Sequence, residues 1–164
     1  LELLKNNKCD IAFLNLPVDD KDFNLSSVVM PLHDTFVANE RFATLAEGVQ
    51  PLKSMHDYPL LMLDTNTVTR KAIIQFSHSI GVHLHPEIEC GSLELMIQLA
   101  KNGVGIACVP REYVRRELSE DKTLFEIRTE PALPARSVGI AFPKNQPVSF
   151  AVKEFFKLFE GETI

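Results

Sequence analysis

The chain has 164 residues, of which 45% are hydrophobic and 24% are charged, and its formal net charge is −5. This length corresponds to about one domain with a substantial core, and no apolar run approaches the roughly 20 residues that cross a bilayer, so no membrane partner is expected. An acidic chain without a basic patch lacks the usual source of nucleic-acid affinity, which argues against direct DNA binding by these residues.

Strand and helix patterns alternate along the chain. Short apolar runs predict strands at residues 11–14, 60–63, 86–90, 104–109, 123–127 and 137–142. Apolar residues spaced by three and four positions predict one helix that ends before residue 11, one that stops at Gly81, one that runs from Ser92 to Asn102, one that begins at Pro110 and one that Ser149 caps. Strands joined by helical crossovers produce a parallel sheet covered on both faces, so the predicted fold class is α/β.

The glycine motif Gly103-Val104-Gly105 follows a helix and precedes a strand. A nucleotide-binding glycine turn requires the opposite order, strand then helix, so we expect no dinucleotide site here. We predict instead that Gly103 ends the helix and that Gly105 lets the strand pass close to a neighbouring element.

Histidines and cysteines offer few candidates for chemistry. Potential zinc ligands stand at His78, His83, His85 and Cys90. No CxxC or HExxH motif accompanies them, so solvated loop histidines are the simpler interpretation, and no metal or cofactor is expected. Cys9 and Cys108 adjoin apolar strands, where burial raises the pKa of a thiol and keeps it inert. Three cysteines at wide spacing are typical of free thiols in a reducing compartment.

The polar turn at residues 64–70 is the strongest candidate for a binding site. It joins the carboxyl end of a predicted strand to a helix, which is where ligands bind in open α/β sheets. Thr65, Asn66 and Thr67 offer hydroxyls and an amide beside the free N–H groups of the helix start, an arrangement that suits a small anion. An alternative interpretation is equally open: Asn66 or Thr67 only caps the helix, and Arg70 is a solvated surface charge.

Residues 90–110, with the sequence CGSLELMIQLAKNGVGIACVP, resemble the core signature of the effector-binding domain of LysR-type transcriptional regulators. In that signature a serine opens a helix, and the helix leads to a GxG strand closed by proline. The strand within residues 8–13, the strand at 137–142 and the aromatic helix at 150–159 also resemble elements of this family. The resemblance covers essentially the whole chain.

The resemblance implies a periplasmic-binding-protein-like (type 2) α/β fold, in which two lobes contain parallel or mixed sheets. Lobe I is expected to comprise residues 1–32 and 134–164, and lobe II residues 33–133. Because the family pattern has more elements in front of this sequence, we expect lobe I to be incomplete and the DNA-binding winged helix-turn-helix to be absent from the chain.

The resemblance also implies a function without catalysis. A small metabolite binds in the cleft between the lobes and controls how attached DNA-binding domains sit on a promoter. Matched position by position, the ligand contacts fall on Thr65, Asn66, Thr67 and Val68 in lobe II and on Asn15, Leu16 and Pro17 in lobe I. Arg70 hints at an anionic effector. The expected partners are this effector and further copies of the chain in a homodimer or homotetramer. DNA is an expected partner only through the missing domain, and the expected location is the bacterial cytoplasm.

One alternative from another class shares the two-lobed fold: an extracellular solute-binding protein of a transporter. The unpaired cysteines and the signature at residues 90–110 count against it, and fold alone does not decide function. An enzyme is not expected, because no acid, base or nucleophile stands in a recognisable arrangement.

The strand at residues 11–14 is expected to lie at a sheet edge that favours pairing with another chain.

Overall fold

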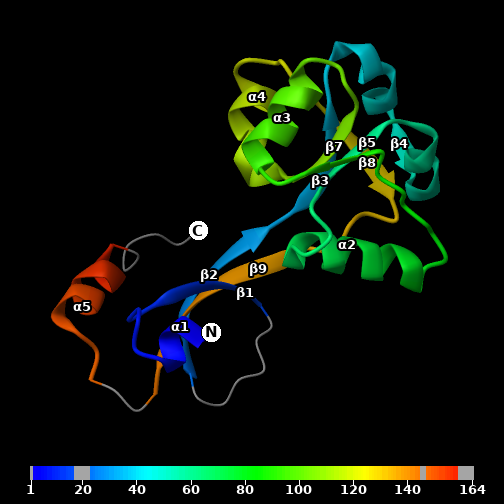
Figure 1. Ribbon diagram of the computed structural model, residues 1–164. Coiled ribbons are helices and arrows are strands. Elements are labelled where there is room, and N and C mark those ends of the chain that lie inside the picture. Colours follow the sequence, from blue (N-terminus) through cyan, green and yellow to red (C-terminus); the bar gives the residue numbers. More distant parts are fainter. Residues whose placement is uncertain (1, 17–22, 145–146, 159–164) are drawn as a thin grey trace. The chain divides into compact units, whose positions relative to one another are not determined.

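The computed structural model describes residues 2–16, 23–144 and 147–158, with the backbone alone at residues 26–29 (Figure 1). The chain divides into two compact units. Unit 1 combines Leu1–Leu32 with Arg136–Ile164, and unit 2 is His33–Ala135. No helix in the described ranges is both long enough and apolar enough to span a bilayer.

Unit 1 is built on a three-stranded antiparallel sheet. Its strands lie in the order β1 (Ala12–Leu16), β9 (Arg136–Pro143) and β2 (Phe23–Leu32). The unit also contains helices α1 (Glu2–Lys5) and α5 (Phe150–Lys157), and Ser149 caps α5 as predicted. Leu4, Phe23 and Ala141 form its small buried cluster. Since β9 occupies the centre, β1 is an edge strand of this sheet, as expected for residues 11–14.

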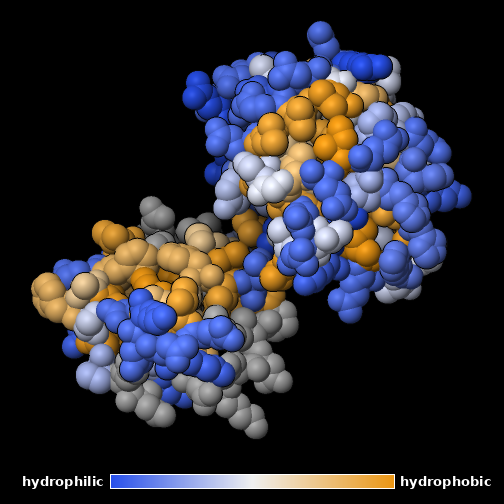
Figure 2. Space-filling model, in the orientation of Figure 1, coloured by the Kyte–Doolittle hydropathy of each residue, from blue (hydrophilic) through white to orange (hydrophobic). Residues whose placement is uncertain are grey.

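Large apolar side chains lie exposed on unit 1 and give it an extensive hydrophobic surface (Figure 2). The most exposed of them are Phe150 at 77%, Leu158 at 72% and Leu3 at 59%. Phe13 of the edge strand is also 48% exposed, and its ring meets that of Phe155 edge to face with 6.0 Å between centroids. Contiguous apolar surface of this kind is typical of a contact with further protein.

Unit 2 contains a six-stranded mixed sheet. Its strands lie in the order β4 (Val49–Pro51), β8 (Phe125–Glu130), β3 (Asp34–Ala38), β7 (Ile106–Pro110), β5 (Leu60–Leu63) and β6 (Ile88–Cys90). The pairs β5–β6, β5–β7 and β4–β8 are parallel, whereas β3 runs antiparallel to both β7 and β8. The parallel sheet predicted from the strand and helix pattern is therefore wrong for β3 and for the antiparallel sheet of unit 1, whereas the mixed sheet that the resemblance implies is confirmed. A helical crossover makes the two strands that it joins run parallel. η3 (Arg111–Val114) and α4 (Arg115–Ser119) connect β7 to β8, and β3 lies between these two strands and runs opposite to both.

Helices cover both faces of this sheet, as predicted. They are η1 (Glu40–Glu47), η2 (Leu52–Asp57), α2 (Val68–Ser79), α3 (Leu93–Lys101), η3 (Arg111–Val114) and α4 (Arg115–Ser119). Strand β7 shows how the two cores arise, because successive side chains of a strand point to opposite faces. Ile106 and Cys108 pack into the cluster that contains Ile73 of α2, while Ala107 and Val109 pack into the cluster of α3.

Residues 92–105 adopt the local structure that the sequence predicts. The Ser92 hydroxyl accepts a hydrogen bond from the Leu95 amide at 3.4 Å and begins α3. Gly103 follows the helix with a φ of 74°, a left-handed conformation that favours glycine. A Cβ on Gly105 would lie 2.3 Å from the Pro59 carbonyl oxygen, so this position requires the absence of a side chain.

Candidate functional site

The turn at residues 64–67 connects the carboxyl end of β5 to the start of α2, and Asp64 organises it. The Asp64 Oδ1 atom accepts the Asn66 amide at 2.9 Å and the Thr65 hydroxyl at 3.4 Å. Its carbonyl oxygen accepts the Thr67 hydroxyl at 2.8 Å, and its amide donates to the Cys90 carbonyl at 3.0 Å. A carboxylate oxygen that accepts the amide two residues later forms an Asx turn, and this turn fixes the path of the chain.

Thr67 is the N-cap of α2. Its Oγ1 accepts the Arg70 amide at 3.2 Å while the hydroxyl proton goes to the Asp64 carbonyl. The capping interpretation is thus confirmed, with Thr67 in that role. The hydroxyl proton and the backbone N–H of Thr67 are both donated to the Asp64 carbonyl, so neither is free to donate to a ligand.

The first turn of α2 keeps free donors. An α-helix leaves its first N–H groups without partners inside the helix. Among the residues that the structure describes, nothing bonds the amides of Val68 and Thr69 or the Oδ2 atom of Asp64. The side chains of Asn66 and Val68 are exposed beside them. The turn therefore presents amide donors and one carboxylate oxygen to the surface.

Arg70 is buried beneath this turn, with only 7% of its surface exposed. One guanidinium nitrogen donates to the sulfur of Met62, and the other lies 3.8 Å from a carboxylate oxygen of Glu89. Burial lowers the pKa of Arg70, whereas Glu89 and Cys108 act to raise it. The interpretation of Arg70 as a solvated charge is wrong, because the phase of the helix turns its side chain toward β5 and β6 and away from solvent.

In unit 1, two of the predicted contact residues lie on the edge strand β1. The Asn15 Oδ1 atom accepts a hydrogen bond from the Arg136 guanidinium at 2.6 Å. The Leu16 side chain packs over Gly139, where an added Cβ would lie 3.0 Å from it. Pro17 lies outside the described residues. The structure thus brings Thr65, Asn66, Thr67 and Val68 together in one turn of unit 2, and Asn15 with Leu16 on one strand of unit 1.

The histidines at the end of α2 lie side by side without forming a metal site. The ring centroids of His78 and His83 are 4.9 Å apart, and those of His83 and His85 are 6.5 Å apart. Across the described part of the chain, no group of three potential ligands could hold a metal ion. Cys90 stands apart from these rings in the core under α3.

All three cysteines are free thiols. Cys90 and Cys108 are buried, and burial raises the pKa of Cys90. Cys9 is half-buried. A raised pKa keeps the Cys90 thiol protonated and a poor nucleophile.

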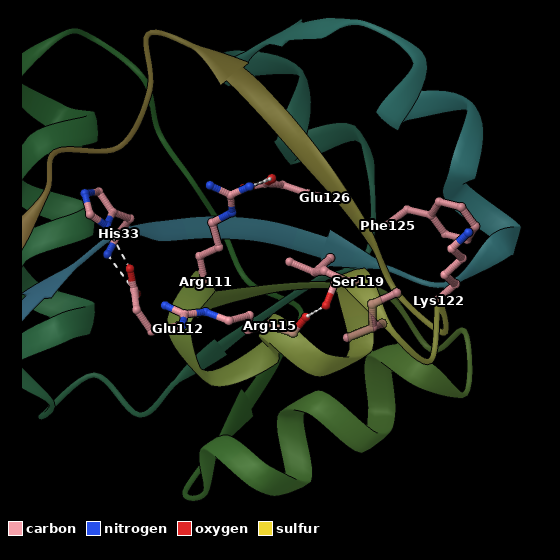
Figure 3. Close-up of a pocket in the computed structure, with 10 residues that line it drawn as sticks. His33, Arg111, Glu112, Arg115, Ser119, Lys122, Phe125 and Glu126 are labelled. Carbon is pink, nitrogen blue, oxygen red and sulfur yellow. Dashed lines mark hydrogen bonds and ion pairs between the residues drawn. The ribbon is translucent and has the colours of Figure 1, made fainter. Parts of the chain in front are cut away.

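Sequence reasoning missed a groove of about 720 Å³ on unit 2, which lies along η3, α4 and β8 (Figure 3). Its basic side chains include Arg111, Arg115 and Lys122, which are spread along a stretch that the sequence predicts only as a helix and a strand. The basic residues that follow Pro110 were the one signal of this groove that the sequence offered. They become a site only when β8 packs beside α4.

Comparison with known proteins gives one family. The family described as LysR substrate binding domain matches residues 1–163. The HTH-type transcriptional activator CmpR of Synechocystis sp. is 29% identical over 108 residues, which cover 65% of this chain and 35% of that protein. The RuBisCO operon transcriptional regulator of Acidithiobacillus ferrooxidans is 23% identical over 158 residues, which cover 96% of this chain and 50% of that protein. The chain thus spans half or less of the length of these relatives.

Solved structures show the same fold. The regulatory domain of Synechocystis CcmR in complex with 2-PG has a TM-score of 0.80 and 19% identity, with 96% of this chain and 74% of that chain covered. The effector binding domain of QuiR in complex with shikimate has a TM-score of 0.76 and 19% identity, with 95% and 72% covered. At these identities the similarity establishes a mixed α/β architecture of the kind that these regulatory domains have.

Proposed function

The chain belongs to the LysR substrate-binding domain family, and we propose that it is the effector-sensing domain of a bacterial LysR-type transcription regulator. The family match over residues 1–163 carries this proposal and confirms the resemblance seen at residues 90–110. The family is one of regulatory domains and not of enzymes, as predicted. The match does not support the alternative of a transporter's solute-binding protein.

We propose that units 1 and 2 are lobes I and II of the family. The effector contacts residues of both lobes and stabilises one arrangement of them by its differential affinity, which changes DNA binding by a winged helix-turn-helix outside this chain. The protein acts in the cytoplasm as a homodimer or homotetramer. The exposed apolar surface of unit 1 supports contacts with further protein.

The turn at residues 64–68 supports a small polar effector with two kinds of group. The free amides at the start of α2 suit an acidic group, since N–H groups and the helix dipole both favour negative charge there. The Oδ2 atom of Asp64 accepts a hydrogen bond from a hydroxyl or amine of the same ligand. The proposed contacts are Thr65, Asn66, Thr67 and Val68, with Asn15, Leu16 and Pro17 from lobe I. The complexes of CcmR with 2-PG and of QuiR with shikimate show that related domains accept small metabolites.

Calorimetry on the full-length regulator tests the site. A panel of hydroxy acids, amino acids and phosphorylated acids first finds a ligand, and Val68→Pro then removes a single amide donor. Proline is well accepted at the first position of a helix, and Thr67 already has the extended backbone that precedes proline, with φ −72° and ψ 144°. We expect about tenfold weaker binding, whereas Val68→Ala keeps the amide and the affinity. Equal affinity in the two variants would contradict the assigned contact.

A further inference from the structure

The groove on unit 2 lies outside the proposed effector turn. It is formed by η3 and α4 on one side and by the start of β8 on the other (Figure 3). Its volume of about 720 Å³ falls within the range of about 300–1,000 Å³ that is typical of small-molecule sites. None of the residues at 64–68 lines it. The groove is therefore a separate candidate for a ligand.

Two of the basic side chains in the groove contact carboxylates of the groove itself. The Arg111 guanidinium pairs with the Glu126 carboxylate at 3.3 Å. The His33 ring lies 2.7 Å from one oxygen of Glu112, and the His33 amide donates to the other at 3.1 Å. Burial acts to raise the pKa of Glu112, but these hydrogen bonds from His33 outweigh it and leave the pKa lowered. Each of the two carboxylates thus has a partner within the groove, and no ion pair among the described residues joins either of them to Arg115 or Lys122.

Arg115 and Lys122 are the remaining basic groups. Within the described ranges, neither side chain has an acidic partner. In Figure 3 the Arg115 guanidinium points toward the Glu112 end of the groove, while Lys122 lies at the opposite end beside the Phe125 ring. Lys122 also has a φ of 50°, a left-handed conformation that is uncommon for a residue other than glycine. Although the formal net charge of the chain is −5, basic groups outnumber carboxylates in the groove, with Arg111, Arg115 and Lys122 against Glu112 and Glu126.

Apolar side chains line the same groove. Leu118 of α4 and Leu124 ahead of β8 line the groove, and Phe125 is 36% exposed within it. We propose that the groove binds a small organic dianion. One acidic group contacts Arg115, the other contacts Lys122, and the carbon skeleton packs on these apolar side chains, which form the apolar floor of the groove. Two separated cations select two separated anionic groups, and the apolar floor selects a hydrocarbon spacer over a compact ion such as phosphate.

Suberate is the probe, because it carries a carboxylate at each end of an apolar chain. Titration of the full-length protein, followed by NMR or calorimetry, compares it with octanoate, which has one carboxylate, and with succinate, which has a short spacer. We expect suberate to bind about tenfold more tightly than either. Arg115→Gln and Lys122→Gln should each weaken suberate about tenfold and reduce its advantage over octanoate.

Arg116→Gln is the matched control. Arg116 is the next residue on α4, its side chain is 73% exposed, and it pairs with Glu120 and Asp121 away from the groove. This variant should bind suberate as the parent protein does. Circular dichroism establishes that each variant is folded before its affinity is compared.

Several results would overturn the proposal. Octanoate that binds as tightly as suberate would show that the groove does not recognise two charges, and so would normal suberate binding by Arg115→Gln. If the groove binds an acidic peptide but not suberate, it is a protein-docking surface and not a dianion site.

Val68→Pro separates the two sites. This variant should leave suberate affinity unchanged, and a loss of affinity would place suberate at the effector turn and refute a site in the groove. Conversely, failure of the effector assignment at residues 64–68 does not alter the expectation for suberate.

Discussion

Replacement of Gly105 by alanine should destabilise unit 2 through a contact between backbones. The added Cβ would lie 2.3 Å from the Pro59 carbonyl oxygen and 3.1 Å from its carbonyl carbon. The same oxygen accepts the Ile106 amide at 2.8 Å, just where β7 runs beside β5. Because the obstructing atoms belong to the main chain and not to a flexible side chain, the two segments must separate to admit the methyl group.

The magnitude follows from this geometry. An ordinary van der Waals contact lies about 1 Å beyond the 2.3 Å separation at Gly105, so the shift is comparable to that of an overpacked core, which costs about 1–3 kcal/mol. Loss of the Ile106 hydrogen bond adds about 1 kcal/mol. The free energy of unfolding should therefore fall by about 2–4 kcal/mol, a large part of the 5–15 kcal/mol that is typical of a domain.

Urea denaturation followed by far-UV circular dichroism measures this change. Gly48→Ala is the control, because Gly48 has an extended backbone and no atom lies within 4 Å of the position that its Cβ would occupy. The control should change the free energy of unfolding by no more than about 0.5 kcal/mol. If Gly105→Ala proves as stable as Gly48→Ala, the close approach of Pro59 does not constrain this strand and the reasoning fails.

Two further predictions concern charged groups in unit 2. In thermal denaturation, Arg70→Met should change the free energy of unfolding by less than about 1 kcal/mol, because the buried guanidinium has weak partners. Arg70→Ala should lower it by about 2–3 kcal/mol, because it leaves a cavity. Equal losses in the two variants would contradict this reasoning. Glu112→Gln should destabilise the protein at neutral pH. Since the folded pKa of Glu112 lies below its ordinary value of 4.5, its stabilisation is present above that pH and is lost as the pH falls through the folded pKa. Unfolding curves at neutral and acidic pH should show the difference from wild type vanish in acid. A difference that persists in acid would exclude the hydrogen bonds between His33 and the Glu112 carboxylate as its cause.

Elements with strong local signals were predictable from the sequence. The strand at residues 60–63 coincides with β5, because an apolar run there is bounded by polar turn residues. Helix α3 follows its predicted course from Ser92 to Asn102, because a capping hydroxyl and a left-handed glycine mark its two ends. In both cases the residues that decide the structure are neighbours in the sequence.

Strands β2 and β3 were not predicted, because their pairing partners are distant in the sequence. β2 contains Pro31, which is tolerated on an edge strand but weakens a strand pattern. β3 is short and buried along most of its length, so it lacks the alternation that marks a half-buried strand. Its place between β7 and β8 depends on hydrogen bonds to residues 107–110 and 125–127, which no local window contains.

The site residues show the same division. The cap at Thr67 was predictable, since its hydroxyl and the amide of Arg70 are three residues apart. Burial of the Arg70 side chain was not, because it depends on Met62 and Glu89 from two neighbouring strands. The groove likewise depends on packing between α4 and β8. Local chemistry thus identifies the turn, whereas the direction of each side chain follows from tertiary contacts.

The two roles of the turn determine which mutation can test it. Thr67→Ala removes the N-cap as well as any ligand contact, and loss of a cap alone costs about 1 kcal/mol. Weaker effector binding by that variant therefore does not separate a frayed helix from a missing contact. Val68→Pro removes an amide that no described residue uses and leaves the Thr67 cap in place. Only a change in affinity that distinguishes Val68→Pro from Val68→Ala reports contact between the effector and the start of α2.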